Sequence, residues 1–277
     1  MGCDRLQLPQ QLAAALGAGD SFERVMALQG EVFRDVPGRR TLRVTLAGRS
    51  YFAKLHFGVG WGEIFKNLVT LRLPVVSART EWEAIRRLDE LGIPTTPAAA
   101  YGCRGVSPAA LRSFILTEDL GGIVSLEDYC RDWPHNPPPL AFRLRLLAAV
   151  ADVARGIHEH GLNHRDFYLC HLCLDVSRLA AGDVHLYLID LHRMQSRRAT
   201  PPAARMKDMA ALYFSALDIG LTRRDCLRFV RRYFDAPLAQ SLRGRQDFWQ
   251  HVDRRARKLY HKFHGRWPLT PFDAEQP

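Results

Sequence analysis

The sequence lacks long apolar runs. No stretch reaches the roughly 18 uncharged apolar residues that a membrane-spanning helix needs. The first residues, MGCDRLQLPQQ, carry an acid where a secretory signal would have an apolar core. We therefore expect a soluble protein that stays in the cytosol. The GxxxxGK[ST] spacing of phosphate-binding loops is also absent, which excludes the P-loop NTPases.

Cysteine is scarce, with six residues in a chain of 277. A chain of this length buries a core large enough to fold without disulfides, so we expect reduced thiols. Cys170 and Cys173 form one C-x-x-C pair, and with His164 and His171 they leave zinc binding or redox chemistry open as an alternative. No second ligand pair follows at the spacing of a zinc finger, which counts against that alternative.

Acidic residues are outnumbered by basic ones. Lys and Arg total 39 against 29 Asp and Glu, a formal net charge of +10. A protein of this charge is attracted to polyanions such as an anionic membrane surface, a phosphorylated glycan or an acidic protein. Much of the excess is arginine at 223–232 and 254–257. No RNA-binding fingerprint accompanies the charge, so nucleic acid is not an expected partner.

The hydrophobic pattern changes along the chain. Three strand-like runs separated by Pro-Gly and Ala-Gly occupy 31–56 and predict an antiparallel meander. Residues 79–91 carry apolar side chains at helical spacing, and residues 113–118 form a short apolar strand. A glycine joint follows, and beyond it a long helix over 141–160, two short strands and further helices are expected. The order predicts an α+β protein with a boundary near residue 121.

The tripeptide His164-Arg165-Asp166 is the most specific motif in the chain. It follows a predicted helix that ends in His-x-x-Gly, as in the catalytic loop of protein kinases. Phosphoryl transfer needs a base or positioning group for the attacking hydroxyl, and Asp166 is the candidate, with Arg165 in the same catalytic loop. Asp190 ends a later strand where kinases carry the magnesium-binding Asp of Asp-Phe-Gly, although LH replaces Phe-Gly here. Asp208 resembles the acid that steadies the catalytic loop.

A phosphate-binding lysine precedes this loop in the sequence. Lys54 lies in the third predicted strand as FAKL and resembles the kinase lysine that holds the α- and β-phosphates. In the helix that follows the meander, Glu81 has the phasing to pair with Lys54, and Glu83 is its rival.

Two features depart from the protein-kinase pattern. His171 takes the place of the Asn that binds a second Mg²⁺, and imidazole is a poorer magnesium ligand than an amide oxygen. The Gly-rich loop is absent, so Arg39, Arg40 and backbone N–H groups are expected to contact the phosphates instead. Glu118 and Leu120, next to the glycine joint, complete the candidate nucleotide site.

With these residues identified, the chain resembles the lipopolysaccharide core heptose(I) kinases, a bacterial family of the protein-kinase-like superfamily. The resemblance extends from about Ala27 to Tyr260. It rests on EVFRDVPGRRTLR, YFAKLHFGVGWGEIFKNL, RTEWEAIRRL, GLNHRDFYLCHLCL, LIDLHR and KDMAALYFSALDIGLTRRD. His171 belongs to this family's pattern.

The resemblance implies a two-lobed protein-kinase-like fold, with an antiparallel-sheet N-lobe at 1–121 and a mainly helical C-lobe at 122–277. It implies phosphorylation of the first heptose of the lipopolysaccharide inner core, with ATP and Mg²⁺ as cofactors, by a cytoplasmic enzyme that is peripheral at the inner face of the inner membrane. Expected partners are this glycolipid, the anionic membrane surface, and an acyl chain or acidic carrier protein near the apolar insert 58–78.

Two alternatives stay open. The acceptor could be different, either a protein Tyr or Ser/Thr or an aminoglycoside-like small molecule, because such kinases share every catalytic residue named above. The chain could also be a non-catalytic basic scaffold that binds nucleotide. Intact Lys54, Asp166 and Asp190 count against the scaffold.

Overall fold

The computed structural model describes residues 3–58, 77–107 and 109–273, so nearly all of the insert predicted at 58–78 lies outside the described residues. The chain forms two compact units. The first unit comprises Met1–Arg87, Thr96–Gly121 and Leu191–Arg193. The second unit comprises Leu88–Thr95, Gly122–Asp190 and Met194–Pro277.

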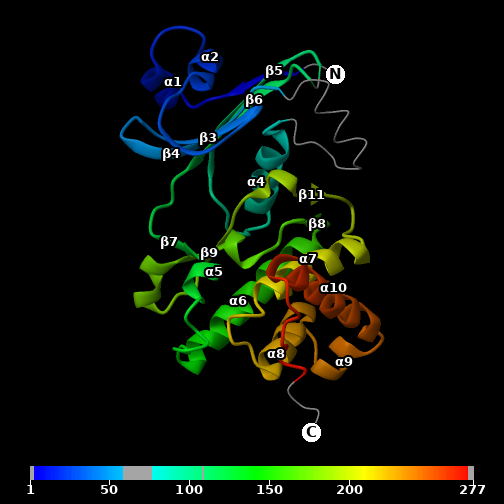
Figure 1. The fold of residues 1–277 in the computed structure, drawn as a ribbon. Coiled ribbons are helices and arrows are strands. Elements are labelled where there is room, and N and C mark those ends of the chain that lie inside the picture. Colours follow the sequence, from blue (N-terminus) through cyan, green and yellow to red (C-terminus); the bar gives the residue numbers. More distant parts are fainter. Residues whose placement is uncertain (1–2, 59–76, 108, 274–277) are drawn as a thin grey trace. The chain divides into compact units, whose positions relative to one another are not determined.

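An antiparallel six-stranded sheet in the order β1-β5-β6-β4-β3-β2 forms most of the first unit (Figure 1). The meander predicted over 31–56 is confirmed as three of these strands, and the strand predicted over 113–118 as a fourth. The six strands are β1 (Cys3–Gln7), β2 (Glu31–Val36), β3 (Arg39–Leu46), β4 (Arg49–His56), β5 (Ala98–Gly105) and β6 (Arg112–Glu118).

One face of this sheet carries the core of the first unit. Alternate residues of β3 and β4 point to opposite faces, and the buried set is Leu42, Val44 and Leu46 with Tyr51, Ala53 and Leu55. Helices α1 (Gln10–Leu16) and α2 (Ser21–Met26) contribute Leu12, Leu16, Phe22 and Val25 to the same cluster. The helix predicted over 79–91 is confirmed as α4 (Arg79–Glu90). The sequence pattern did not predict β1, β5, α1 or α2.

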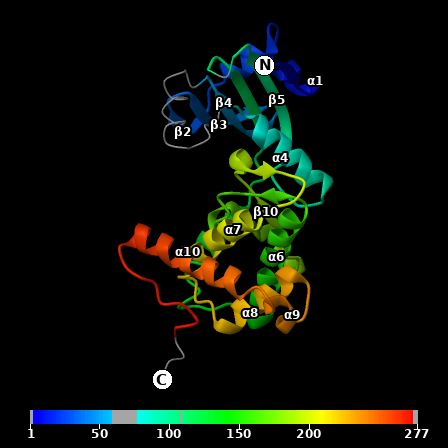
Figure 2. The same ribbon diagram turned by 90° about the vertical axis from the view of Figure 1, so that its right-hand side faces the viewer.

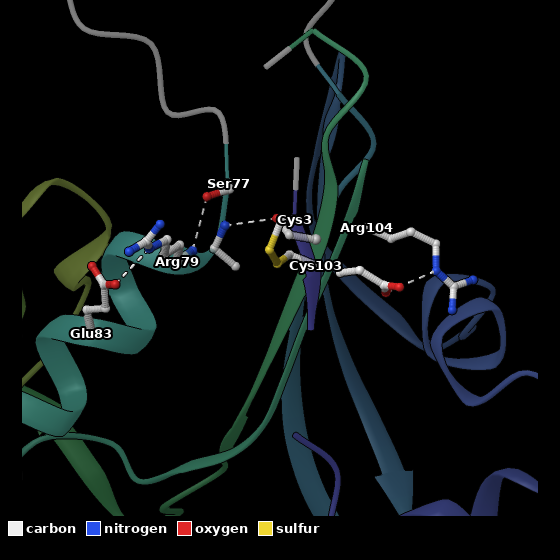
Figure 3. Close-up of a disulfide and its surroundings, with 9 residues drawn as sticks. Cys3, Ser77, Arg79, Glu83, Cys103 and Arg104 are labelled. Carbon is white, nitrogen blue, oxygen red and sulfur yellow. Dashed lines mark hydrogen bonds and ion pairs between the residues drawn. A yellow bond between two sulfur atoms is a disulfide. The ribbon is translucent and has the colours of Figure 1, made fainter. Parts of the chain in front are cut away.

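A disulfide between Cys3 and Cys103 joins β1 to β5 (Figure 3). Their Cα atoms are 5.8 Å apart, within the range that a disulfide needs. The expectation of reduced thiols is therefore wrong for this pair. The two cysteines are 100 residues apart in the sequence, and only the antiparallel pairing of β1 with β5 brings them together. The remaining cysteines, Cys130, Cys170, Cys173 and Cys226, are free.

The second unit is mainly helical (Figure 2). The helix predicted over 141–160 is confirmed as α6, which buries Leu146, Val150, Val153 and Ile157. Helix α6 packs against α8, and α7 packs against α10. The helices of this unit are α5 (Leu126–Tyr129), α6 (Leu140–Glu159), α7 (Pro202–Ser215), α8 (Arg223–Phe234), α9 (Leu238–Leu242) and α10 (Gln246–His264). Across the described ranges, no helix has both the length and the apolar character needed to cross a bilayer.

Two small sheets hold the segments between these helices. Strands β7 (Ile123–Ser125), β9 (Leu172–Asp175) and β10 (Leu186–Leu188) form one sheet, in the order β10-β9-β7. Strands β8 (Leu162–Asn163) and β11 (Gln195–Ser196) form the other. The run LCHLCLDV is strand only from Leu172, because Leu169–His171 form a 3-10 turn. A sheet-rich first half and a helical second half confirm the α+β class.

Gly161, between α6 and β8, provides a test of the backbone. It has a φ of 79°, and a Cβ at this position would lie 1.9 Å from the carbonyl oxygen of Arg197. We predict that Gly161→Ala lowers the free energy of unfolding by more than about 2 kcal/mol, because the clash adds to the cost of a left-handed conformation.

Gly182→Ala is the matched control for this substitution. Gly182 has a φ of 74°, and no atom lies within 4 Å of the added Cβ. We therefore expect Gly182→Ala to lower the free energy of unfolding by only about 1 kcal/mol. Urea denaturation measures both variants, and equal losses would contradict the predicted clash.

Candidate active site

Lys54 and Glu81 form a buried ion pair in the first unit. The distance from Lys54 Nζ to Glu81 Oε1 is 2.5 Å, and the side chains are 15% and 3% exposed. Lys54 lies on β4, which is paired on both sides, and it points away from the face that carries Ala53 and Leu55. Glu81 lies in the first turn of α4. The structure thus brings together the two residues that the sequence proposed as partners.

Glu83, the rival partner, lies elsewhere. Its carboxylate is exposed and accepts a hydrogen bond from Arg79 Nε at 2.7 Å (Figure 3). The Lys54–Glu81 pair is costly by comparison, because burying two charges requires desolvation that their attraction only partly offsets. Among the described residues, Glu81 Oε2 has no hydrogen-bond partner. A buried charge pair with an unused carboxylate oxygen is typical of a functional site.

The two predicted phosphate-binding arginines lie on opposite faces of the sheet. In the β3–β4 register Arg39 stands opposite His56, whereas Arg40 stands opposite Leu55. The side chain of Arg39 therefore shares the face of Lys54, and Arg40 lies on the other face, where it contacts Asp35 at 2.8 Å. The structure brings Arg39, and not Arg40, to the side of the sheet that carries Lys54.

His56 adds a neutral ring to this face. Burial lowers the pKa of His56 to about 3, and the charges of Arg39 and Lys54 act in the same direction. At physiological pH the ring therefore adds no further positive charge beside Lys54.

Glu118 and Leu120, the residues predicted near the glycine joint, lie at and just after the C-terminal end of β6. Glu118 closes β6, and its carboxylate contacts Arg49 at 3.2 Å. Leu120 follows, half-buried, directly before Gly121 and Gly122. Both glycines have a positive φ, 55° and 54°, which a side chain would strain. The structure does not bring the Glu118 carboxylate into contact with the Lys54–Glu81 pair.

In the second unit, Asp208 of α7 holds the HRD loop. Its Oδ2 accepts the backbone N–H of His164 at 2.7 Å, and its Oδ1 accepts that of Arg165 at 2.9 Å. Asp208 is fully buried, so these bonds replace the water that the carboxylate loses on folding. The predicted role of Asp208 in steadying the loop is confirmed.

The backbone is strained at Arg165 and Asp190. They have φ values of 74° and 61°, and they are two of the four non-glycine residues with positive φ in the described part of the chain. Such a conformation costs roughly 1–2 kcal/mol and persists only where the surroundings enforce it. At Arg165 the hydrogen bond to Asp208 supplies part of that constraint. Strain of this kind concentrates at functional sites.

His171 links Asp166 to Asp190. Its Nδ1 lies 2.6 Å from the backbone oxygen of Asp166, and because a carbonyl only accepts, Nδ1 carries the proton. Its other ring nitrogen, Nε2, lies 3.6 Å from Asp190 Oδ2. The N–H of Ile189 also donates to the His171 carbonyl at 2.9 Å. Three predicted site residues are thereby held in one cluster.

The cysteines beside this cluster are poor candidates for zinc or redox chemistry. Burial raises the pKa of Cys170 to about 11, and it does the same for Cys173. Both thiols are therefore protonated near neutral pH, whereas metal binding and thiol exchange need the thiolate. Within the described ranges, no group of three or more His, Cys, Asp or Glu side chains has the arrangement of a metal site.

Two further features of the second unit could not be predicted from the sequence. The first is a buried chain in which the His158 ring joins Tyr233, at 2.8 Å from its hydroxyl, to Asp208, at 3.3 Å. Burial lowers the pKa of His158, so the ring is neutral and relays hydrogen bonds without adding charge. No pattern in the sequence pairs residues 158, 208 and 233, because they come from three separate helices.

The second feature is an apolar cavity of about 350 Å³. Its walls come mainly from α6, α7, α8 and α10 and include Leu146, Val150, Leu212, Ile219, Val230 and Phe272. Four buried polar atoms of its lining have no hydrogen-bond partner in the described structure, namely Arg143 Nε, Tyr213 Oη, Trp249 Nε1 and Asp253 Oδ1. Helical periodicity predicts which side chains are buried, but it does not tell a filled core from a hollow one.

A sheet lysine paired with a helical glutamate, together with an HRD loop anchored by a helical aspartate, defines a protein of the protein-kinase-like class. The chain belongs to the lipopolysaccharide kinase (Kdo/WaaP) family, whose model matches residues 23–233. The resemblance inferred from the motifs and the assignment to the phosphotransferases are thereby confirmed. Membership of a kinase family also implies the use of ATP.

Individual relatives agree with this assignment. The chain is 51% identical over 259 residues to the lipopolysaccharide core heptose(I) kinase WaaP of Pseudomonas aeruginosa, which covers 93% of this chain and 97% of that protein. It is 44% identical over 255 residues to the kinase of the same name from Escherichia coli, covering 92% and 96%. A solved structure described as WaaP in complex with acyl carrier protein matches with a TM-score of 0.80 at 47% identity, over 92% of this chain and 99% of that one.

Glu81 and Glu83 provide a matched pair of substitutions. We predict that Glu81→Gln lowers kcat/KM for ATP at least about tenfold, because the buried ammonium of Lys54 loses its charged partner. Glu83→Gln removes only an exposed surface pair and should change it less than about twofold. Steady-state kinetics on folded protein, checked by circular dichroism, measures both. Equal effects of the two changes would remove Glu81 from the site.

Proposed function

We propose that the protein transfers the γ-phosphoryl group of ATP to the first heptose of the lipopolysaccharide inner core. The observation that carries this proposal is the Asp166–His171–Asp190 cluster, in a chain 51% identical to a heptose(I) kinase. Mass spectrometry of core sugars after incubation with enzyme and ATP, beside a generic protein substrate, tests it. Phosphate on the protein substrate alone would favour the alternative acceptor.

Asp166 is the proposed catalytic base. The loop that carries it is fixed by the Asp208 hydrogen bonds to His164 and Arg165, and the His171 ring holds the Asp166 carbonyl. With the backbone fixed at these points, the proposed task of the Asp166 carboxylate is to orient the sugar hydroxyl and accept its proton. Arg165 belongs to the same loop, and its role is to maintain the strained turn.

Asp190 and His171 are the proposed metal ligands. The carboxylate of Asp190 is a hard oxygen donor, and Nε2 of His171 lies 3.6 Å from it. Mg²⁺ takes few protein ligands when it also binds phosphates and water, so a set this small fits it. When bound, Mg²⁺ would neutralise charge on the nucleotide phosphates. One oxygen and one nitrogen donor also fit Mn²⁺, so the choice of divalent metal is part of the test.

The first unit is the proposed nucleotide-binding lobe. Lys54, oriented by Glu81, is suited to the α- and β-phosphates, and Arg39 lies on the same sheet face. The backbone from Glu118 to Leu120, next to two glycines in left-handed conformations, is proposed for the remaining nucleotide contacts. We assign residues 1–121 to this lobe and residues 122–277 to the lobe that holds the catalytic loop and the acceptor. Arg40 is not retained, because it lies on the opposite face.

An acyl carrier protein is the proposed protein partner. A protein with 47% identity has been solved in complex with one. The cavity of the second unit is suited to the acyl chain of such a carrier, since most of its lining side chains are apolar and its volume is about 350 Å³. The net charge of +10 complements an acidic carrier and also the anionic inner face of the inner membrane, where we place the enzyme as a peripheral protein.

We expect Asp166→Asn and Asp190→Asn to impair different properties of the enzyme, turnover in the first variant and nucleotide binding in the second. Asp166→Asn keeps the shape of the side chain but removes the base, so nucleotide binding should persist while turnover falls roughly 10² or more. Asp190→Asn should instead weaken nucleotide binding in a metal-dependent way, and higher Mg²⁺ should restore part of the rate. ATP titrations at several Mg²⁺ concentrations separate the two. Turnover near the wild-type rate for Asp166→Asn would overturn the mechanism.

The cavity proposal has its own test. Ile219→Trp fills part of the cavity, and we predict that it weakens binding of an acyl carrier protein with a long acyl chain at least about tenfold, because the chain loses its apolar contacts. Leu140→Trp, at an exposed position of α6 outside the cavity lining, is the control. Calorimetric titration with acylated and unacylated carrier measures both variants. The cavity assignment fails if the carrier binds equally well with and without its acyl chain.

A further inference from the structure

Five basic side chains follow one face of α10. His251, Arg254, Arg255, Lys258 and Lys262 recur at intervals of three and four residues, which places them on a single side of the helix. All five are exposed, and they extend along roughly 17 Å of the helix at 1.5 Å per residue. With Met206 of α7 and Leu259 they line a shallow groove. We call this surface the α10 basic face.

The α10 basic face has no acidic partner. In the described structure none of its Arg and Lys side chains lies within ion-pair distance of an Asp or Glu. Other arginines in the same unit are paired: Arg257, on another side of α10, contacts Asp253 at 2.8 Å and Asp273 at 2.7 Å. Like charges one helical turn apart destabilise a helix, so four Arg and Lys side chains without an acidic partner indicate an anion from outside the chain.

The arginines of α8 differ in this respect. Arg232 contacts Asp152 at 2.7 Å, and Arg228 contacts Asp225 at 3.5 Å. Part of the positive charge at 223–232 is therefore neutralised within the fold. On α10, by contrast, four exposed Arg and Lys side chains without an acidic partner line one groove.

Large apolar side chains are exposed at the end of the same helix. Phe263, in the last turn of α10, is 67% exposed, and beyond the helix Trp267 is 60% and Leu269 85% exposed. Exposed Trp, Phe and Leu next to Lys and Arg are the signature of a surface that binds at the membrane interface. An acidic protein would match the charge, but a lipid surface matches both the charge and the exposed apolar side chains.

We propose that the α10 basic face, together with Phe263, Trp267 and Leu269, binds the surface of an anionic phospholipid bilayer. The basic side chains contact the phosphate groups, and the apolar side chains enter the headgroup region. The inference deepens the proposed function and rests on it for its purpose, since a glycolipid acceptor lies in such a membrane. The surface is distinct from the catalytic cluster and from the carrier-protein cavity, so each can be tested alone.

The test compares two variants with the same net charge. Arg255→Glu/Lys258→Glu reverses two charges on the α10 basic face, and Arg224→Glu/Arg231→Glu reverses two exposed charges on α8. Sedimentation with phosphatidylcholine vesicles, with and without phosphatidylglycerol, measures binding of the full chain. We expect the α10 variant to lose at least about 25-fold in affinity for the anionic vesicles, at roughly fivefold per basic residue, and the α8 variant much less. Trp267→Ala should weaken binding even at low salt.

Two outcomes would overturn this proposal. Equal losses in the two variants would mean that net charge alone attracts the protein. Unchanged vesicle affinity in the α10 variant would remove the face from the membrane contact, and loss of carrier-protein binding in its place would make it a protein-docking surface. Phosphorylation of delipidated core oligosaccharide provides the separate readout. It should be unchanged in both variants, and its absence in the wild type would contradict the proposed function and leave the vesicle result standing.

Discussion

The buried carboxylate of Asp208 is the constraint on which the catalytic cluster depends. A fully buried charge is tolerated only when hydrogen bonds replace its hydration. Here two backbone N–H groups of the HRD loop do so, and the neutral ring of His158 approaches the same carboxylate. Because a carboxylate only accepts, His158 donates from Nε2, and its Nδ1 accepts from the Tyr233 hydroxyl. The desolvation of one acid therefore fixes the loop to the helical core.

The loop held by Asp208 in turn constrains the backbone of the residues that follow it. The Arg165 peptide is held in a left-handed conformation, the chain turns at Asp166, and the His171 ring bonds the Asp166 carbonyl. His171 then faces Asp190, which is itself strained at a φ of 61°. The links are the hydrogen bond from His171 to the Asp166 carbonyl, the 3.6 Å approach of His171 to Asp190 and the two strained dihedrals, and together they constrain the spacing of the two acids. In this arrangement the imidazole that departs from the protein-kinase pattern also supports the loop.

What the sequence predicted correctly was local. The meander, α4 and α6 follow from periodicities within a few turns, and the phasing that selected Glu81 over Glu83 is a property of one helix. The pairing of β1 with β5, and the disulfide that it allows, depends on segments about 100 residues apart, which no spacing rule connects. Arg39 and Arg40 were indistinguishable for a related reason. Only the pleat of β3 against β4 assigns them to opposite faces.

Prediction from net charge is limited in the same way, because the composition gives the number of arginines but not which of them form ion pairs within the fold. The net charge of +10 includes guanidinium groups held by Asp152, Asp225, Asp253 and Asp273, and these stabilise the second unit. Arg143, for example, is largely buried against Asp225 and belongs to the cavity wall. Subtracting such pairs leaves a much smaller set of charges that face solvent alone. Attraction to a polyanion thus depends on where the folded chain leaves exposed basic residues without an acidic partner, and the α10 basic face is one such place.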